Sequence, residues 1–326
     1  DFMTERFFTR RGNIELNRIV VGEIINSNFL SKSLSKIKPE FQVNRLIDQG
    51  FTTFDTADSY GRRNEFLGKC FSKIQRNSFE IISKVYFPYS TDPKKKGLSN
   101  FNINASFEFS AKTLNVDYLD LILAHRFDPD VPMEETIQSM TNLVSAGKVR
   151  AWGISEWNAS QISNLAELCE KNGFTMPIIN QCQASLIWRS SLNNVQETCN
   201  VHQISLMAWS PLAQGVLTGK YVRGRKPPKN SRWANNQTPF LKYFLETELI
   251  DELARYRKIN KLTSQTMGKI ALGWLFEKGI DSVVTNFKSG LVKPIGSVEK
   301  HIKELEELTA PYAIINSDFV GKDSPK

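Results

Sequence analysis

The 326-residue sequence predicts a single α/β domain, a (β/α)8 TIM barrel with a long basic loop between strands 7 and 8. Eight short apolar runs alternate with amphipathic, helix-like segments, which is the pattern of repeated βα units. Several runs are apolar almost throughout, as in parallel strands that helices cover. The glycine-rich turn of a Rossmann domain is absent from the sequence. Eight such units favour a closed barrel over an open doubly wound sheet.

The expected strands are the eight apolar runs, in chain order. They are Ile19–Gly22, Thr52–Ala57, Phe79–Lys84, Tyr118–His125, Val149–Ser155, Pro177–Cys182, Ser205–Pro211 and Asp281–Asn286. The clearest helical segments are Phe41–Gln49, Glu65–Ile74, Asn104–Leu114, Met133–Ala146, Ala159–Lys171 and Met267–Lys278. Four glycines follow helix ends, where a left-handed residue is favoured: Gly50, Gly147, Gly173 and Gly279. Asn158 stands at a helix start, where we expect an N-cap.

The spacing between the seventh and eighth strands is about twice that of the other units. Within it, Val216–Leu245 is rich in Arg, Lys, Pro and Asn. A loop of this length inside a domain is usually functional. A charged extra helix is expected near Thr247–Lys261. The domain is expected to span residues 1–326, with a loosely held tail from about residue 313.

The composition is that of a soluble globular protein, with 40% apolar and 23% charged residues. No apolar run approaches the roughly 20 residues that span a bilayer. The four cysteines show no metal-binding spacing and are expected to be free thiols, which favours a cytoplasmic protein. The net charge of +8 fits nucleic acid, an anionic membrane face or an anionic cofactor. The basic residues are spread along the chain without a nucleic-acid-binding module, so we expect no nucleic-acid partner.

Polar residues stand where three consecutive strands end. They are Asp55 and Tyr60 after the second strand, Lys84 at the end of the third and His125 at the end of the fourth. In a (β/α)8 barrel, catalytic groups lie at this end of the strands. Taken singly, each residue has an ordinary explanation: a loop cap, a half-buried phenol, a solvated lysine and a structural histidine. Together on three neighbouring strands, they favour a catalytic centre.

These four residue types suit the reduction of a carbonyl group, which needs a hydride on carbon and a proton on oxygen. A free tyrosine, with a pKa of about 10, holds its proton tightly at neutral pH. A neighbouring ammonium stabilises the phenolate, and a carboxylate keeps that ammonium charged and oriented. An imidazole polarises the carbonyl and orients the substrate. The sequence therefore predicts proton transfer by Tyr60, supported by Asp55, Lys84 and His125.

The chain resembles the aldo-keto reductases over nearly its whole length. The motifs that carry the resemblance are Phe54–Gly61 with Glu65 and Leu67-Gly68, the strand with Lys84, Tyr118–Leu121, His125, Gly147–Arg150 with Gly153–Ser155, and Trp209–Gly215. Within the family, Pro132–Thr136 and Trp209–Tyr221 are similar to the branch that contains potassium-channel β subunits and their microbial relatives. The resemblance implies Asp55, Tyr60, Lys84 and His125 as the catalytic tetrad.

The resemblance also implies a binding site for NADPH. Ser155 and Gln181 would hold the nicotinamide carboxamide, and Trp209 would pack against the ring. Ser210, Leu212 and Gly215 would lie along the pyrophosphate, and Lys220 and Arg232 would reach the adenosine 2′-phosphate. Two cations at that phosphate favour NADPH over NADH. A solvated loop position is an equal alternative for Arg232.

Two segments depart from the family pattern. Glu23 follows Gly22 where a Gly-Thr-type turn is usual, and Asn286–Gly290 stands where a glycine-led adenosine-binding run is usual. Both departures bear on cofactor binding rather than on the chemistry. His125 stands where channel β subunits commonly carry Asn, which favours a working enzyme.

The sequence thus predicts an NADPH-dependent reductase of aldehydes or ketones with a small-molecule carbonyl substrate and no metal. A regulatory subunit of the channel β type, with an altered cofactor site, is the alternative. A dehydrogenase that works in the oxidative direction differs only in substrate and cofactor ratio. The physiological carbonyl, a homo-oligomeric state and a channel-like partner are left open, because they depend on variable loops such as Tyr86–Phe101 and on surface residues.

Overall fold

Eight parallel strands form a closed barrel in the computed structural model, which describes residues 4–22, 39–92, 94–229, 231–235, 244–285 and 299–316. The strands are β3 (Ile19–Val21), β4 (Thr53–Asp55), β5 (Glu80–Val85), β6 (Leu119–Ala124), β7 (Val149–Ser155), β8 (Ile179–Gln183), β9 (Ser205–Trp209) and β10 (Ser282–Thr285). Closure comes from β10, which pairs with both β9 and β3. The predicted barrel is confirmed, and each strand coincides with its expected apolar run, although β5 and β8 extend one residue beyond it.

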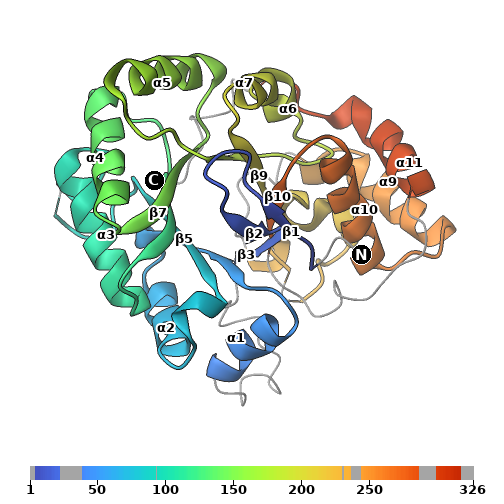
Figure 1. Ribbon diagram of the computed structural model, residues 1–326. Coiled ribbons are helices and arrows are strands. Elements are labelled where there is room, and N and C mark those ends of the chain that lie inside the picture. Colours follow the sequence, from blue (N-terminus) through green and yellow to red (C-terminus); the bar gives the residue numbers. More distant parts are fainter. Residues whose placement is uncertain are drawn as a thin grey trace.

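Helices surround the barrel and cover its outer face (Figure 1). They are α1 (Pro39–Asp48), α2 (Arg62–Phe71), α3 (Asn100–Leu114), α4 (Met133–Ser145), α5 (Ala159–Asn172), α6 (Ser190–Asn194), α7 (Gln196–Val201), α9 (Leu249–Ile259), α10 (Ser264–Glu277) and α11 (Glu299–Thr309). The predicted helices are present, with ends that differ by a few residues. The expected extra helix near Thr247–Lys261 is α9. Short 3-10 helices include η2 (Asp58–Tyr60), η4 (Ala213–Thr218) and η5 (Trp233–Asn235).

The predicted helix ends also have the expected local geometry. Asn158 forms a reciprocal capping box with Gln161, in which each side chain accepts a hydrogen bond from the backbone of the other. All four glycines expected after helix ends have a left-handed backbone, with φ between 66° and 88°. Glycine adopts this conformation without the steric cost that other residues meet.

An N-terminal hairpin, which the sequence did not predict, covers one end of the barrel. Its strands β1 (Arg6–Phe8) and β2 (Glu15–Asn17) are antiparallel, and the hairpin lies over the middle of the ring in Figure 1. The hairpin is hydrogen-bonded to residues at the strand starts. Asn17 Oδ1 accepts from the amides of Thr52 and Thr53, and the Arg10 amide donates to Ser205 Oγ. Leu16 packs into the core inside the barrel. The hairpin therefore closes the N-terminal end, and a site is expected at the other end.

Within the described residues, none of the helices combines the length and the hydrophobicity of a membrane-spanning segment. The four cysteines are buried and form no disulfide. Within the same residues, no cluster of His, Cys, Asp or Glu is arranged to hold a metal ion.

Candidate active site

The four residues of the expected catalytic centre lie together at the C-terminal end of the barrel. Asp55 ends β4, Lys84 lies near the end of β5, and His125 directly follows β6. Tyr60 comes from η2, in the loop after β4. Lys84 Nζ is 2.5 Å from Asp55 Oδ2 and 5.4 Å from the centre of the Tyr60 ring. The rings of Tyr60 and His125 are 6.3 Å apart.

Asp55 and Lys84 form a buried ion pair beneath Tyr60. The two residues are 5% and 1% exposed. Lys84 Nζ also donates to the carbonyl oxygen of Thr56 at 2.8 Å, and Gln181 Nε2 donates to Asp55 Oδ1 at 2.9 Å. Buried charges are tolerated when they are paired and their remaining hydrogen-bonding capacity is used. These contacts therefore fix the ammonium in one position below the phenol.

Tyr60 is the accessible member of the group, with 37% of its surface exposed. The Lys84 ammonium lies 5.4 Å from the centre of its ring, and the Arg63 guanidinium lies 4.6 Å from the same point. Two cations therefore lie close to this one ring. The residue is therefore accessible to a bound molecule and to solvent.

His125 is a neutral imidazole at the edge of the same site. It is 8% exposed, and burial, together with the charges of Lys84 and Arg126, holds its pKa well below the ordinary value of 6.5. Nδ1 is buried and makes no hydrogen bond within the described part of the chain. The Phe87 ring lies edge-on at 4.9 Å. A neutral imidazole with one N–H suits the polarisation of a carbonyl oxygen.

Two charged residues of this rim, Arg126 and Glu156, are not among the residues predicted from the sequence. Arg126 Nη1 donates to the His125 carbonyl oxygen at 2.5 Å, and its guanidinium lies 5.5 Å from the centre of the Phe87 ring. Burial lowers the pKa of Arg126, and the charge of Glu156 opposes that effect. Glu156 is the first residue after β7 and Arg126 the second after β6, so the strand-end rule that indicated His125 applies to them as well.

The residues expected at the nicotinamide end lie on three adjacent strands. Ser155 on β7 pairs in register with Gln181 on β8, and both side chains are buried. Trp209 ends β9, the next strand around the barrel. The Gln181 amide nitrogen points to Asp55. The structure therefore places this group beside the Asp55–Lys84 pair.

The loop Ser210–Gly215, which is expected to contact the pyrophosphate, has an unusual backbone. Ser210, Ala213, Gln214 and Gly215 have positive φ values of 50°, 45°, 56° and 98°. Left-handed residues in a tight turn expose successive backbone amides, which is how anions are held. Glycine is favoured at Gly215 because its φ of 98° is a backbone conformation that side chains with a Cβ atom rarely adopt. Leu212 is half-buried in the same loop.

The Lys220 and Arg232 side chains both lie next to Tyr221. Lys220 Nζ is 5.1 Å from the Tyr221 ring centre, and the charge of Arg232 acts on the Tyr221 hydroxyl. Tyr221 is 1% exposed and packs edge-on against Trp233 at 5.4 Å. These contacts bring the two expected phosphate-binding cations to one end of the Ser210–Gly215 loop. Glu23 and Asn286–Gly290 lie outside the described residues.

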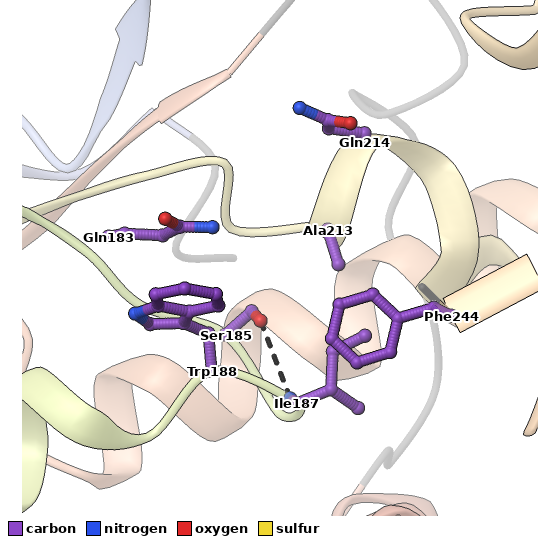
Figure 2. A pocket seen from close by; sticks show the side chains of 7 residues that line it. All are labelled: Gln183, Ser185, Ile187, Trp188, Ala213, Gln214 and Phe244. Atoms are coloured by element: carbon purple, nitrogen blue, oxygen red, sulfur yellow. Dashed lines mark hydrogen bonds between the residues drawn. The ribbon is translucent and has the colours of Figure 1, made fainter. Parts of the chain in front are cut away.

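Two pockets adjoin this rim. A water-sized cavity of about 10 Å³ lies between the loops after β8 and β9, and Figure 2 shows the Trp188 and Phe244 rings on its walls. It is too small for an organic ligand. A second pocket of about 560 Å³ is within the size range of small-molecule sites. Tyr86, Pro88, Lys94, Lys96, Phe101 and Asp130 line it. The Tyr86 ring contacts Phe87 at 5.2 Å, so this pocket begins one side chain away from His125.

Comparison with known proteins gives relatives over most of the chain. The model of the Aldo/keto reductase family matches residues 31–312. A putative voltage-gated potassium channel subunit beta of Schizosaccharomyces pombe is 32% identical over 273 residues, which are 80% of this chain and 78% of that protein. A probable subunit of the same kind from Oryza sativa subsp. japonica is 30% identical over 292 residues, 86% of each chain. A putative aryl-alcohol dehydrogenase, AAD16, of Saccharomyces cerevisiae is 29% identical over 297 residues, 81% of this chain and 84% of that protein.

Proposed function

Because the chain belongs to the aldo/keto reductase family, whose members are typically NAD(P)H-dependent oxidoreductases, we propose that it reduces aldehydes and ketones with NADPH. Tyr60 is the proton donor. One observation carries the proposal: a buried Lys84–Asp55 pair lies directly beneath an accessible phenol, with a neutral imidazole beside it. This arrangement matches what proton delivery to a carbonyl oxygen requires.

Each of the four residues has a distinct part in the proposed reaction. NADPH, when bound, supplies the hydride for the carbonyl carbon. His125 donates a hydrogen bond to the carbonyl oxygen and so orients and polarises it. Tyr60 transfers its proton to that oxygen, which completes the alcohol, and the phenolate regains a proton from solvent. Lys84 stabilises the phenolate, and Asp55 holds Lys84 in position.

The described residues fit NADPH. Ser155 and Gln181 would bind the carboxamide, and Trp209 would pack against the nicotinamide ring. Ser210, Leu212 and Gly215 would lie along the pyrophosphate, because a turn with several left-handed residues is a backbone shape that can hold an anion. Lys220 and Arg232 would bind the 2′-phosphate, and this basic part of the loop between β9 and β10 is the reason that we propose NADPH rather than NADH.

The aromatic rings beside His125 support a substrate that itself carries an aromatic ring. Phe87 and Tyr86 form an aromatic wall between the pocket of about 560 Å³ and His125. An aryl aldehyde would pack against these rings with its carbonyl group at Tyr60. The name of the yeast relative, an aryl-alcohol dehydrogenase, agrees with this substrate class.

A regulatory subunit is the second candidate function. It is favoured by the relatives named as potassium-channel β subunits. On this alternative the chain keeps the fold and acts through a channel-like partner, without rapid turnover.

Fluorescence titration with NADPH, followed by NADPH consumption with 4-nitrobenzaldehyde, separates the two functions. The reductase predicts micromolar binding and steady turnover that depends on the aldehyde. NADH in place of NADPH is the control for recognition of the 2′-phosphate. Failure to bind at tens of micromolar, or binding without turnover over a broad panel of aldehydes, ketones and sugars, would contradict the reductase and favour the regulatory subunit.

A further inference from the structure

Glu156, the residue after β7, has a backbone conformation that glutamate rarely adopts. Its φ is 60°, in the left-handed region. For a residue with a Cβ atom this conformation is sterically unfavourable, because Cβ comes too close to the following carbonyl oxygen. Such a conformation persists where the surrounding structure imposes it, and it often marks a functional constraint. The contacts of the Glu156 side chain show what that constraint is.

The Glu156 carboxylate joins the ends of two further strands. Oε1 accepts a hydrogen bond from Trp209 Nε1 at 2.6 Å and from the Gln183 backbone amide at 2.5 Å. The Glu156 amide donates to the Gln181 carbonyl oxygen at 3.1 Å. Hydrogen bonds to a carboxylate are shorter and stronger than those between neutral groups. One side chain thus links the ends of β7, β8 and β9 at the rim.

Charge connects the same carboxylate to the other side of the site. Burial raises the pKa of Glu156, and the Arg126 guanidinium, the Trp209 indole and the Gln183 amide oppose that rise. Arg126 in turn donates to the carbonyl oxygen of His125. Arg126, bonded to the His125 carbonyl, and Glu156, bonded to Trp209, therefore act on each other through charge across the rim.

A half-buried tryptophan at the end of a strand can turn about its side-chain bonds unless its polar edge is held. The Trp209 indole N–H is held by Glu156. We propose that Glu156 is a positioning residue that keeps the Trp209 ring in a single orientation, so that the nicotinamide ring meets a preformed surface. The second half of this inference rests on the proposed function. The first half, the orientation of the indole, does not.

The hold on the indole can be measured without any cofactor. The chain has six tryptophans, and Trp209→Phe identifies which indole N–H resonance belongs to Trp209. In Glu156→Ala that resonance is expected to move upfield and to exchange with water about tenfold faster, which corresponds to the loss of one hydrogen bond to a charged group. Glu156→Gln keeps an acceptor oxygen and a similar volume. In this variant the Trp209 resonance is expected to lie between its positions in the wild type and in Glu156→Ala. Glu108→Gln, an exposed glutamate paired with Lys148, is the matched control and leaves the resonance unchanged.

The consequence for the cofactor is tested by a double-mutant cycle. Glu156→Ala is expected to raise the Kd for NADPH about tenfold in the wild-type background and to have no further effect in Trp209→Phe. A merely structural role for Glu156 would instead weaken binding equally in both backgrounds.

An unchanged Trp209 resonance in both Glu156 variants would overturn the proposal. A shifted resonance with equal effects of Glu156→Ala on NADPH binding in both backgrounds would overturn its second half. If the wild type binds no NADPH, the proposed function fails, and the indole resonance still decides whether Glu156 holds Trp209.

Discussion

Asp58 is a second carboxyl group next to the site, two residues before Tyr60. It is fully buried, and its Oδ2 accepts a hydrogen bond from Ser106 Oγ at 2.7 Å, while Oδ1 has no partner within the described residues. Burial raises the pKa of Asp58 from 3.8 to about 7, although Ser106, the Ser59 amide and the charge of Lys84 act in the opposite direction. The folded protein therefore retains a proton on Asp58 that the unfolded chain releases.

Asp58→Asn is expected to change how stability depends on pH. Between pH 3.8 and about 7 only the unfolded chain loses this proton, so the free energy of unfolding of the wild type falls as pH rises, by up to about 1.4 kcal/mol per unit. Asparagine removes this dependence. Urea unfolding at a series of pH values should show the stability of Asp58→Asn, relative to the wild type, rising to about pH 7 and then levelling. Exposed Asp117→Asn should run parallel to the wild type. A parallel curve for Asp58→Asn would contradict the assignment.

At the residue level, position after a strand was the informative signal. Because parallel strands end at one rim, Asp55, Lys84 and His125 were predicted to meet, and they do. Arg126 and Glu156 lie near the ends of β6 and β7 but are not among the residues predicted from the sequence. Their proximity depends on loop conformation, including the left-handed backbone of Glu156, which no sequence pattern indicates.

Helices α2 and α3 approach each other closely at one glycine. A Cβ atom on Gly68 of α2 would lie 2.2 Å from the Thr113 carbonyl oxygen and 3.0 Å from the Leu114 carbonyl carbon, both backbone atoms of the α3 terminus. The helices could make room only by moving apart. Gly68 therefore sets the distance between the two helices that flank β5, the strand that carries Lys84.

Gly68→Ala is expected to lower the free energy of unfolding by about 3 kcal/mol, because overpacking against backbone cannot relax locally. Gly273 of α10 is the matched control, since a Cβ there meets only the tip of the Ile302 side chain at 3.1 Å. Gly273→Ala should change stability by less than about 1 kcal/mol, as alanine favours the helix. Urea denaturation of both variants measures the difference. Equal losses of stability would show that the Gly68 contact does not set the distance between α2 and α3.

At the level of elements, the long periodic segments were predicted well. The barrel strands and the helices α1 to α5 follow from apolar runs and amphipathic periodicity. The β1–β2 hairpin was not predicted, because its short strands, Arg6–Phe8 and Glu15–Asn17, each contain a charged residue and form no apolar run. Its place at the strand starts is specified by hydrogen bonds from Asn17 and Arg10 to residues far along the chain.

For the whole molecule, the barrel with its hairpin at one end leaves the other end for chemistry. The net charge of +8, which the sequence left open between several anionic partners, is explained in our account by an anionic cofactor. A ligand that binds only the folded state stabilises it, by about 2.7 kcal/mol at 100 times its Kd.

The midpoint temperature of thermal unfolding should therefore rise by several degrees when NADPH is added. It should rise by less with NADH at the same concentration. Lys220→Met should reduce the difference between the two cofactors, because it removes one cation from the 2′-phosphate. Equal shifts with NADPH and NADH in the wild type would mean that the basic loop does not recognise that phosphate.

The most direct test of the account is the rate of carbonyl reduction by Tyr60→Phe, measured in single turnover with bound NADPH and 4-nitrobenzaldehyde. Loss of the phenolic proton is expected to slow reduction by about 10²–10⁴-fold while the Kd for NADPH stays the same. Reduction at the wild-type rate in this variant would show that the proton comes from elsewhere, and the role given to the Lys84–Asp55 pair would fall with it.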